Sequence, residues 1–203
     1  MVCFVDCTSL KKNSEIFQKM NTIYSNQVKE VLKEKQIIQL EKWTSMKCNG
    51  IIFDSEKDDW SIKTSTFQRK MINKKHFILL IETDDGEIFG FYTNKIHYSD
   101  VFAFNLESNG RLPKPIKFEI NSPKNYQMSI NNNSQQELFH YLSIAMFKKE
   151  YKNKSYCYLD CYFIQSNPNL NQIYGKENKY KENEFNEKIV EFNPIRFFVI
   201  QLE

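Results

Sequence analysis

The chain has 203 residues, of which 41% are hydrophobic and 15% are aromatic. These values are typical of a globular protein and exclude a chain that stays disordered for lack of apolar surface. The 28 basic and 25 acidic side chains give a formal net charge of +3. A dedicated nucleic-acid binder usually has a larger basic excess, so this balance argues against nucleic acid as the main partner.

The start of the chain, its apolar stretches and its cysteines bear on its cellular compartment. The first residues, MVCFVDCTSLKK, lack the basic and apolar regions of a signal peptide. The longest apolar stretch, Phe77–Ile81, is too short to span a bilayer. Five scattered cysteines suit a reducing environment. We therefore expect a cytoplasmic protein with no membrane span.

The first 46 residues are predicted to form a helical lead-in. No glycine or proline occurs before Gly50, and apolar residues recur at helical spacing between residues 9 and 43. Four of them fall seven residues apart, but three of the matching seam positions are polar: Gln27, Glu34 and Glu41. Two interpretations stay open: a long helix packed on the following domain, or a homodimer through a coiled coil of residues 9–43.

From Gly50 onward, short apolar runs between turn signals predict β-strands. Residues 50–55 are predicted to form a buried strand, and Thr64–Ile72 a short helix. The strongest local signal is a hairpin in which Asp84-Asp85-Gly86 joins Phe77–Ile81 to Glu87–Tyr92. Asp-Gly suits a tight turn because both central residues can take positive φ.

A second hairpin is predicted around Asn109-Gly110, between Val101–Leu106 and Ile116–Ile120. Pro113 and Pro115 mark its return arm as an edge strand or a loop.

The last third of the chain gives weaker signals. For Gln136–Lys149, a helix and a mixture of strand and loop both stay open, and Lys176–Lys188 is predicted to be a charged surface loop or a disordered insert. Ser155–Gln165 and Ile195–Leu202 are predicted strands. Together the elements predict an α+β fold, with an antiparallel β-sandwich-like core flanked by short helices and preceded by the long N-terminal helix.

Several of these segments, in order, resemble the TLDc domain, a family associated with protection against oxidative damage and with the vacuolar proton-pumping ATPase. The matching segments are Ile51-Ile52-Phe53-Asp54-Ser55, Asp58-Asp59-Trp60-Ser61, Phe77 to Tyr92, Val101 to Leu106, Ser155-Tyr156-Cys157 with Phe163, and Phe192 to Leu202. The resemblance covers roughly residues 40–203 and implies a TLDc-like domain at 47–203. It implies a non-enzymatic protein-interaction module whose partner is a peripheral subunit of that ATPase.

An acidic loop that ends in a tryptophan is the candidate partner-binding site. It contains Asp54, Asp58, Asp59 and Trp60. An exposed tryptophan beside charged residues is a common composition for an energetically important contact. The acidic residues lack the spacing of a calcium-binding loop, and the alternative is a solvated loop that favours the start of the following helix. A buried Trp60 would remove the partner-binding interpretation.

The cysteines offer a second kind of chemistry. Cys48 follows Lys47 and is the candidate redox thiol, since a neighbouring cation favours a reactive thiolate. Cys3 and Cys7, like Cys157 and Cys161, are four residues apart. On a strand, as predicted for Cys157 and Cys161, that spacing separates two sulfurs by about 13 Å, which is too far for one zinc ion. On a helix, Cys3 and Cys7 could share a ligand face, so that pair stays open, but no metal site is predicted.

No catalytic residue and no cofactor are predicted. The chain lacks a nucleophile-elbow motif, a phosphate-binding glycine loop and a zinc-protease motif. Two basic clusters offer an alternative function as a dimeric nucleic-acid-binding or regulatory module. One cluster is Arg69-Lys70 with Lys74-Lys75, and the other is Arg111, Lys114 and Lys117.

Overall fold

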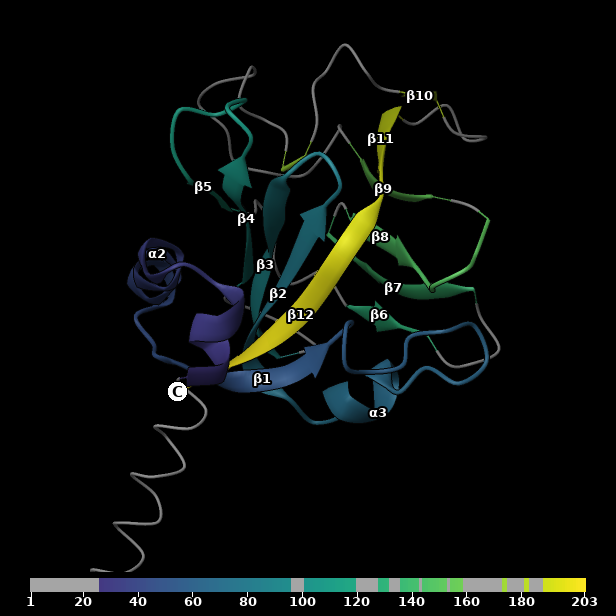
Figure 1. The fold of residues 1–203 in the computed structure, drawn as a ribbon, viewed down its shortest axis with the longest axis horizontal. Helices are drawn as coiled ribbons and strands as arrows, with labels where there is room; N and C mark the ends of the chain where they lie inside the picture. Colours follow the sequence, from purple (N-terminus) through teal and green to yellow (C-terminus); the bar gives the residue numbers. More distant parts are fainter. Residues whose placement is uncertain are drawn as a thin grey trace, which may run out of the picture.

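In the residues that it describes, the structure of this chain, a computed structural model, contains two six-stranded antiparallel sheets (Figure 1). It describes residues 26–95, 101–119, 128–131, 136–142, 144–152, 154–158, 173–174, 181–182 and 188–203. The first sheet runs in the order β1 (Cys48–Asp54), β12 (Pro194–Leu202), β2 (Lys75–Thr83), β3 (Glu87–Lys95), β4 (Val101–Ser108) and β5 (Ile116–Glu119). The second runs β10 (Lys181–Glu182), β11 (Lys188–Phe192), β9 (Ser155–Tyr158), β8 (Ile144–Phe147), β7 (Glu137–Tyr141) and β6 (Ser129–Ile130).

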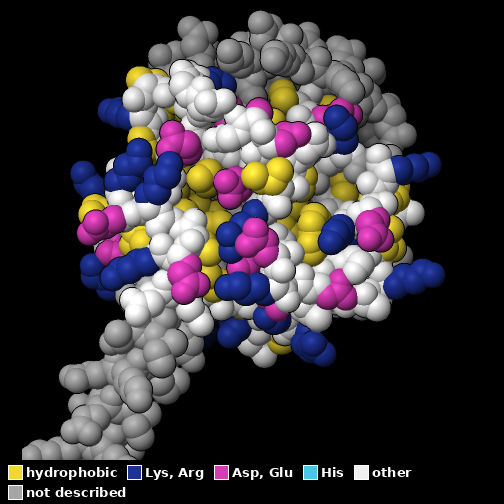
Figure 2. Space-filling view, viewed as in Figure 1, with side chains coloured by type: hydrophobic (Ala, Val, Ile, Leu, Met, Phe, Trp, Pro, Cys, Tyr) yellow, Lys and Arg dark blue, Asp and Glu magenta, His cyan; other side chains and the backbone are white. Residues whose placement is uncertain are grey.

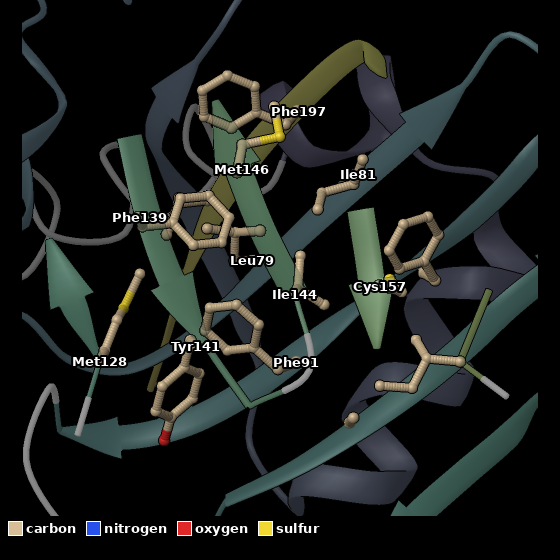
Figure 3. Close-up of a cluster of buried hydrophobic side chains, with 14 of the residues drawn as sticks. Leu79, Ile81, Phe91, Met128, Phe139, Tyr141, Ile144, Met146, Cys157 and Phe197 are labelled. Atoms are coloured by element: carbon tan, nitrogen blue, oxygen red, sulfur yellow. The ribbon is translucent and has the colours of Figure 1, made fainter. Parts of the chain in front are cut away.

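The two antiparallel sheets pack against each other over an aromatic core, which is compatible with the predicted β-sandwich. Alternate residues of β2 divide between two clusters: Leu79 and Ile81 point between the sheets, whereas Ile78 and Leu80 belong to the opposite face. The close-up in Figure 3 shows Leu79, Phe91 and Phe197 of the first sheet meeting Phe139, Tyr141, Ile144 and Met146 of the second. The rings of Phe91 and Tyr141 lie with their centroids 4.6 Å apart.

The helical segment before β1 covers the outer face of the first sheet. Its residues Val28, Leu32 and Leu40 are buried in one cluster with Ile78, Leu80 and other side chains of that face. Trp43 contacts Phe104 with ring centroids 5.7 Å apart. The molecule therefore has three layers, and in its described part the lead-in packs on the sandwich.

The prediction of one long helix is wrong where the structure describes it. Residues 26–31 are helical, the chain leaves the helix at Leu32 and Lys33, and α2 (Glu34–Thr44) begins anew. Lys33 is extended, with φ −67° and ψ 147°. A straight helix would rotate Leu40 by about 120° from Val28, so the break allows both to face the sheet. The rest of the predicted coil, residues 9–25, lies outside the described residues.

Both predicted hairpins are confirmed, but their turns differ. In the first, the Gly86 N–H donates to the Thr83 carbonyl, and only Gly86 takes positive φ, so the expectation for Asp85 is wrong. This is a type I turn followed by a left-handed glycine. In the second, Asn109 and Gly110 both take positive φ (47° and 81°), as in a type I′ turn.

The remaining local predictions are settled in part. β7 and β8 form an antiparallel hairpin, which resolves residues 136–149 in favour of strands over a helix. The helix predicted at 64–72 is shorter, since α3 spans Phe67–Met71. The predicted strand 155–165 is described as β9 over Ser155–Tyr158, and most of the predicted loop 176–188 lies outside the described residues.

Candidate functional site

Asp54 of the predicted partner-binding loop is a buried structural residue. It ends β1, and its side chain is 3% exposed. The Arg196 guanidinium of β12 donates to both of its oxygens, Nε to Oδ1 at 3.2 Å and Nη2 to Oδ2 at 2.7 Å. Asp54 is therefore committed to holding β1 against β12 and does not face a partner.

Asp58 and Asp59 hold the shape of the loop. The Asp58 carboxylate accepts from Lys70 Nζ at 2.6 Å and from the Asp54 backbone N–H at 3.0 Å. The Asp59 carboxylate accepts from the hydroxyl and the backbone N–H of Ser61. Hydrogen bonds from the Ser61 and Thr64 side chains lower the pKa of Asp59 to about 2. Both carboxylates are thus bonded within the loop and its neighbouring helix.

Trp60 has a different environment from these carboxylates. Its ring packs edge to face on Phe197, with centroids 5.1 Å apart, and it is partly buried against the central core. Its backbone carbonyl accepts from the Lys149 N–H at 3.2 Å, which joins the loop to the segment after β8. Its remaining surface lines an open groove.

We call this the Trp60 groove, and it has a volume of about 860 Å³. It is bounded by the loop after β1, the segment between β8 and β9, and the junction of β11 and β12. Its lining residues are Ser55, Glu56, Trp60, Phe147, Lys148, Lys149, Glu150, Tyr151, Lys152, Lys154, Ser155, Phe192, Asn193, Pro194 and Ile195. Such a volume is within the range of ligand and peptide sites.

The groove combines positive charge with apolar surface. Lys149, Lys152 and Lys154 are exposed, whereas Lys148 is buried and its Nζ lies 3.4 Å from the Ile62 carbonyl oxygen. Burial lowers the pKa of Lys148. The lining contains four lysines and two acidic residues, Glu56 and Glu150, so its formal net charge is positive.

The apolar surface of the groove comes from two segments of the chain, one between β8 and β9 and the other at the start of β12. The rings of Phe147 and Tyr151 stack with centroids 5.2 Å apart. Ile195 is 58% exposed, which is high for a large aliphatic side chain. Aromatic and aliphatic surface beside lysines is the composition expected for binding an acidic, partly apolar segment.

Cys48 does not have the environment of a reactive thiol, and the redox prediction is corrected here. The residue is 6% exposed, at the start of β1. Burial, with the negative charge of Glu41, raises the pKa of the thiol to about 12. The thiol is therefore protonated at neutral pH and is shielded from solvent. Cys157 is likewise buried in the central core, while Cys3, Cys7 and Cys161 lie outside the described residues.

The two predicted basic clusters line different depressions, and several of their members form ion pairs. Arg69, Lys70 and Lys74 line a shallow depression beside β1, where Lys70 is paired with Asp58. Arg111 forms a nearly buried ion pair with Glu87, and Lys117 pairs with Glu119 and lies over the Phe102 ring. On the face shown in Figure 2, basic and acidic side chains alternate with apolar side chains between them.

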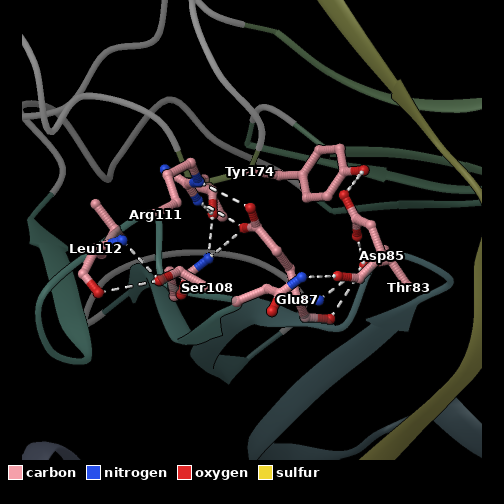
Figure 4. Close-up of polar contacts among 10 residues, drawn as sticks. Thr83, Asp85, Glu87, Ser108, Arg111, Leu112 and Tyr174 are labelled. Atoms are coloured by element: carbon pink, nitrogen blue, oxygen red, sulfur yellow. Dashed lines mark hydrogen bonds and ion pairs between the residues drawn. The ribbon is translucent and has the colours of Figure 1, made fainter.

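A second polar cluster joins two turns to the Ile173–Tyr174 segment (Figure 4). Arg111 donates to both oxygens of Glu87 at 2.6 and 2.8 Å, and Asn105 Nδ2 also donates to Glu87, at 2.8 Å. The Tyr174 hydroxyl donates to Asp85 at 2.9 Å, and burial together with this carboxylate raises the Tyr174 pKa. These contacts connect structural elements, and the Arg111–Glu87 pair among them is nearly buried.

Two kinds of feature are absent from the residues that the structure describes. No three His, Cys, Asp or Glu side chains in this part of the chain gather as a metal-binding group. No helix among the same residues has the length and apolar character needed to cross a membrane. In comparisons with known proteins, no family model matches the chain and no curated protein matches its sequence.

Only one part of the groove is predicted from the sequence. The acidic-loop pattern points to Trp60, but not to the lysines and aromatic residues between Phe147 and Lys154 or to the β11–β12 junction. The run Lys148-Lys149-Glu150-Tyr151-Lys152 with Lys154 is a signal that was available in the sequence. What the sequence did not show is that this run lies beside Trp60, almost ninety residues earlier in the chain.

Proposed function

We propose that the chain is a non-enzymatic protein-interaction module that binds an acidic segment of a partner protein in the Trp60 groove. The observation that carries this proposal is the net positive lining of the groove, where exposed Lys149, Lys152 and Lys154 stand beside Trp60 and Tyr151. Carboxylates of the partner would pair with the lysines, and its apolar side chains would cover the exposed Ile195.

The resemblance to the TLDc domain supports a finer proposal about the partner. It implies a peripheral subunit of the vacuolar proton-pumping ATPase, a cytosolic location and a role in protection against oxidative damage. The matching segments Ile51 to Ser55 and Phe192 to Leu202 correspond to β1 and β12 in this fold, which pair with each other.

An acidic protein segment is favoured over nucleic acid by the composition of the groove. Glu56 and Glu150 would repel a continuous phosphate backbone, and apolar Pro194 and Ile195 offer it no contact. An acidic polypeptide carries its charges discontinuously, so its apolar residues can lie where the groove has no lysine.

The test is a charge reversal at the three exposed lysines, Lys149→Glu, Lys152→Glu and Lys154→Glu together. The probe is a labelled peptide of alternating glutamate and leucine, measured by fluorescence anisotropy. We expect the variant to lose affinity by about tenfold or more, because three ion pairs are replaced by like-charge contacts. A control variant reverses Lys29, Lys42 and Lys63, which are exposed and outside the groove.

Equal losses in both variants would mean that only net charge matters and would contradict the proposal. An oligonucleotide bound more tightly than the peptide, and lost in the same groove variant, would favour the nucleic-acid function instead. The finer proposal predicts that purified peripheral ATPase sector is retained by the native chain and by the control variant. Failure of retention alone would reject that partner and leave the acidic-segment proposal standing.

A further inference from the structure

We propose that a second cavity, at the N-terminal end of α2, binds a small carboxylate ligand with an aliphatic body. This inference goes beyond the proposed function, since the cavity shares no lining residue with the Trp60 groove. It lies between the first turns of α2, the end of β4 and the chain that leads to β5. Its volume is about 360 Å³, at the lower end of the range for small-molecule sites. Its lining residues are Lys35, Gln36, Gln39, Asn105, Leu106, Glu107, Ser108, Leu112, Pro113, Lys114 and Pro115.

An unpartnered donor on Gln36 is the first reason for this assignment. Gln36 lines the cavity and is only 4% exposed. Its Oε1 accepts from the Lys33 backbone N–H at 2.9 Å, and this bond fixes the orientation of the amide. Among the residues that the structure describes, the Nε2 group then has no hydrogen-bond partner. A buried N–H group of this kind is normally satisfied, so an acceptor bound in the cavity would supply the hydrogen bond that this group lacks.

The charges around the cavity select an anionic acceptor over a neutral one. Lys35 and Lys114 line it and are exposed, and Glu107 is the acidic residue among the lining side chains. Gln36 also lies in the first turn of α2, where the helix dipole favours negative charge. A carboxylate would accept from Gln36 Nε2 and would be attracted by both ammonium groups.

The other lining residues indicate the body of the ligand. Leu106, Leu112, Pro113 and Pro115 supply aliphatic surface without an aromatic ring. Asn105 also lines the cavity, but its Nδ2 donates to Glu87 and to the Ile173 carbonyl. Since Asn105 pairs with the inward-facing Phe89, its side chain points between the sheets and does not serve this ligand. A short aliphatic carboxylate fits these features.

The experiment titrates the full chain with butanoate and with two matched probes, butanamide and butan-1-amine, by isothermal calorimetry and by two-dimensional NMR. We expect saturable one-to-one binding of butanoate, weaker binding of the neutral amide, and none of the amine. Chemical-shift changes should centre on α2 and on residues 106–115.

Gln36→Glu is the decisive variant. Glutamate at this position keeps an oxygen acceptor for the Lys33 N–H, so the helix start is preserved, but it replaces the donor with a negative oxygen. We expect butanoate affinity to fall about tenfold or more. The matched control is Gln68→Glu on α3, which makes the same charge change at an exposed position. Lys114→Gln is a second, exposed variant that should weaken binding without affecting folding.

Three outcomes would overturn the proposal. The first is the absence of saturable butanoate binding at millimolar concentration, which would assign the cavity to water. The second is equal binding of butanoate by Gln36→Glu and by the native chain. The third is tighter binding of the amine than of the carboxylate.

Discussion

Arg196 is the single side chain on which the acidic loop depends most. It donates to the buried Asp54, and its Nη1 also lies 3.0 Å from the exposed Glu56. Removing the cation leaves the Asp54 carboxylate buried without its main partner, which is far more costly than losing a surface pair.

We expect Arg196→Met to lower the free energy of unfolding by about 3–5 kcal/mol, measured by urea denaturation. The control is Glu56→Gln, which removes only the exposed partner and should cost no more than about 1 kcal/mol. Comparable losses in the two variants would show that burial of Asp54 is not what makes the pair important.

Cys48 provides a second prediction for a single residue. Its thiol has a raised pKa, about 12 against the ordinary 9.0, because it is buried beside Glu41. At pH 8 we expect native Cys48 to be alkylated at least about tenfold more slowly than in urea, as followed by site-resolved mass spectrometry. Rapid labelling of native Cys48 would contradict the burial described here.

The same shift fixes the direction of a pH effect on stability. Above pH 9 the unfolded thiol has lost its proton while the native thiol keeps it until about pH 12. The native state then binds more protons, so the contribution of Cys48 to stability falls as pH rises through this range. In a Cys48→Ala variant, the free energy of unfolding should therefore fall less between pH 9 and pH 12 than it does in the native chain.

Among the secondary-structure elements, the pairing of β2 with β3 depends on a glycine. A Cβ atom added at Gly90 would lie 1.9 Å from the Leu79 carbonyl oxygen, which is backbone and cannot move away easily. Gly110 is different: no atom of the described residues lies within 4 Å of an added Cβ, but its φ of +81° is unfavourable for other residues.

We therefore expect Gly90→Ala to destabilise the protein by about 3 kcal/mol or more, through overpacking. Gly110→Ala should cost only about 1–2 kcal/mol, through backbone strain alone. Thermal unfolding of the two variants measures the difference. A smaller effect at Gly90 than at Gly110 would mean that β2 and β3 are farther apart than described.

At the scale of the whole molecule, the helical segment completes a second hydrophobic cluster. Val28, Leu32 and Leu40 cover Ile78, Leu80 and Phe198 on the outer face of the first sheet. A sheet with both faces apolar needs a cover on each side, and the second sheet covers only one of them.

A truncation tests this arrangement. A chain that begins at residue 47 should expose the outer face and bind a dye for apolar surface, whereas a chain that begins at residue 26 should not. The shorter chain should also unfold at a lower temperature, since it loses the burial of Leu40, worth about 2 kcal/mol or more by itself. Equal stability of the two chains would show that residues 26–46 contribute little to the fold.

Much of the local structure could be predicted from the sequence. The Asp-Gly and Asn-Gly turns, the apolar strands Phe77–Ile81 and Val101–Leu106 and the closing strand all follow from preferences of neighbouring residues. Turn type and side-chain alternation depend on backbone angles within a few residues, so a single segment contains the information. The turn at Asp85 shows the limit of such prediction. The Asp-Gly dipeptide fits both a type I′ turn and a type I turn followed by a left-handed glycine, and the sequence alone does not select between them.

The helix break and the candidate sites were decided by tertiary structure. Nothing in the sequence near Lys33 breaks a helix, but Val28 and Leu40 must both reach one sheet face. The sequence places Asp54 in an acidic loop, as expected for a surface carboxylate. In the fold it is buried and paired with Arg196, which lies 142 positions later in the chain. The Trp60 groove likewise joins residues 60, 147–154 and 192–195. Burial and charge pairing depend on which distant segments meet, and only the packing of the two sheets determines that.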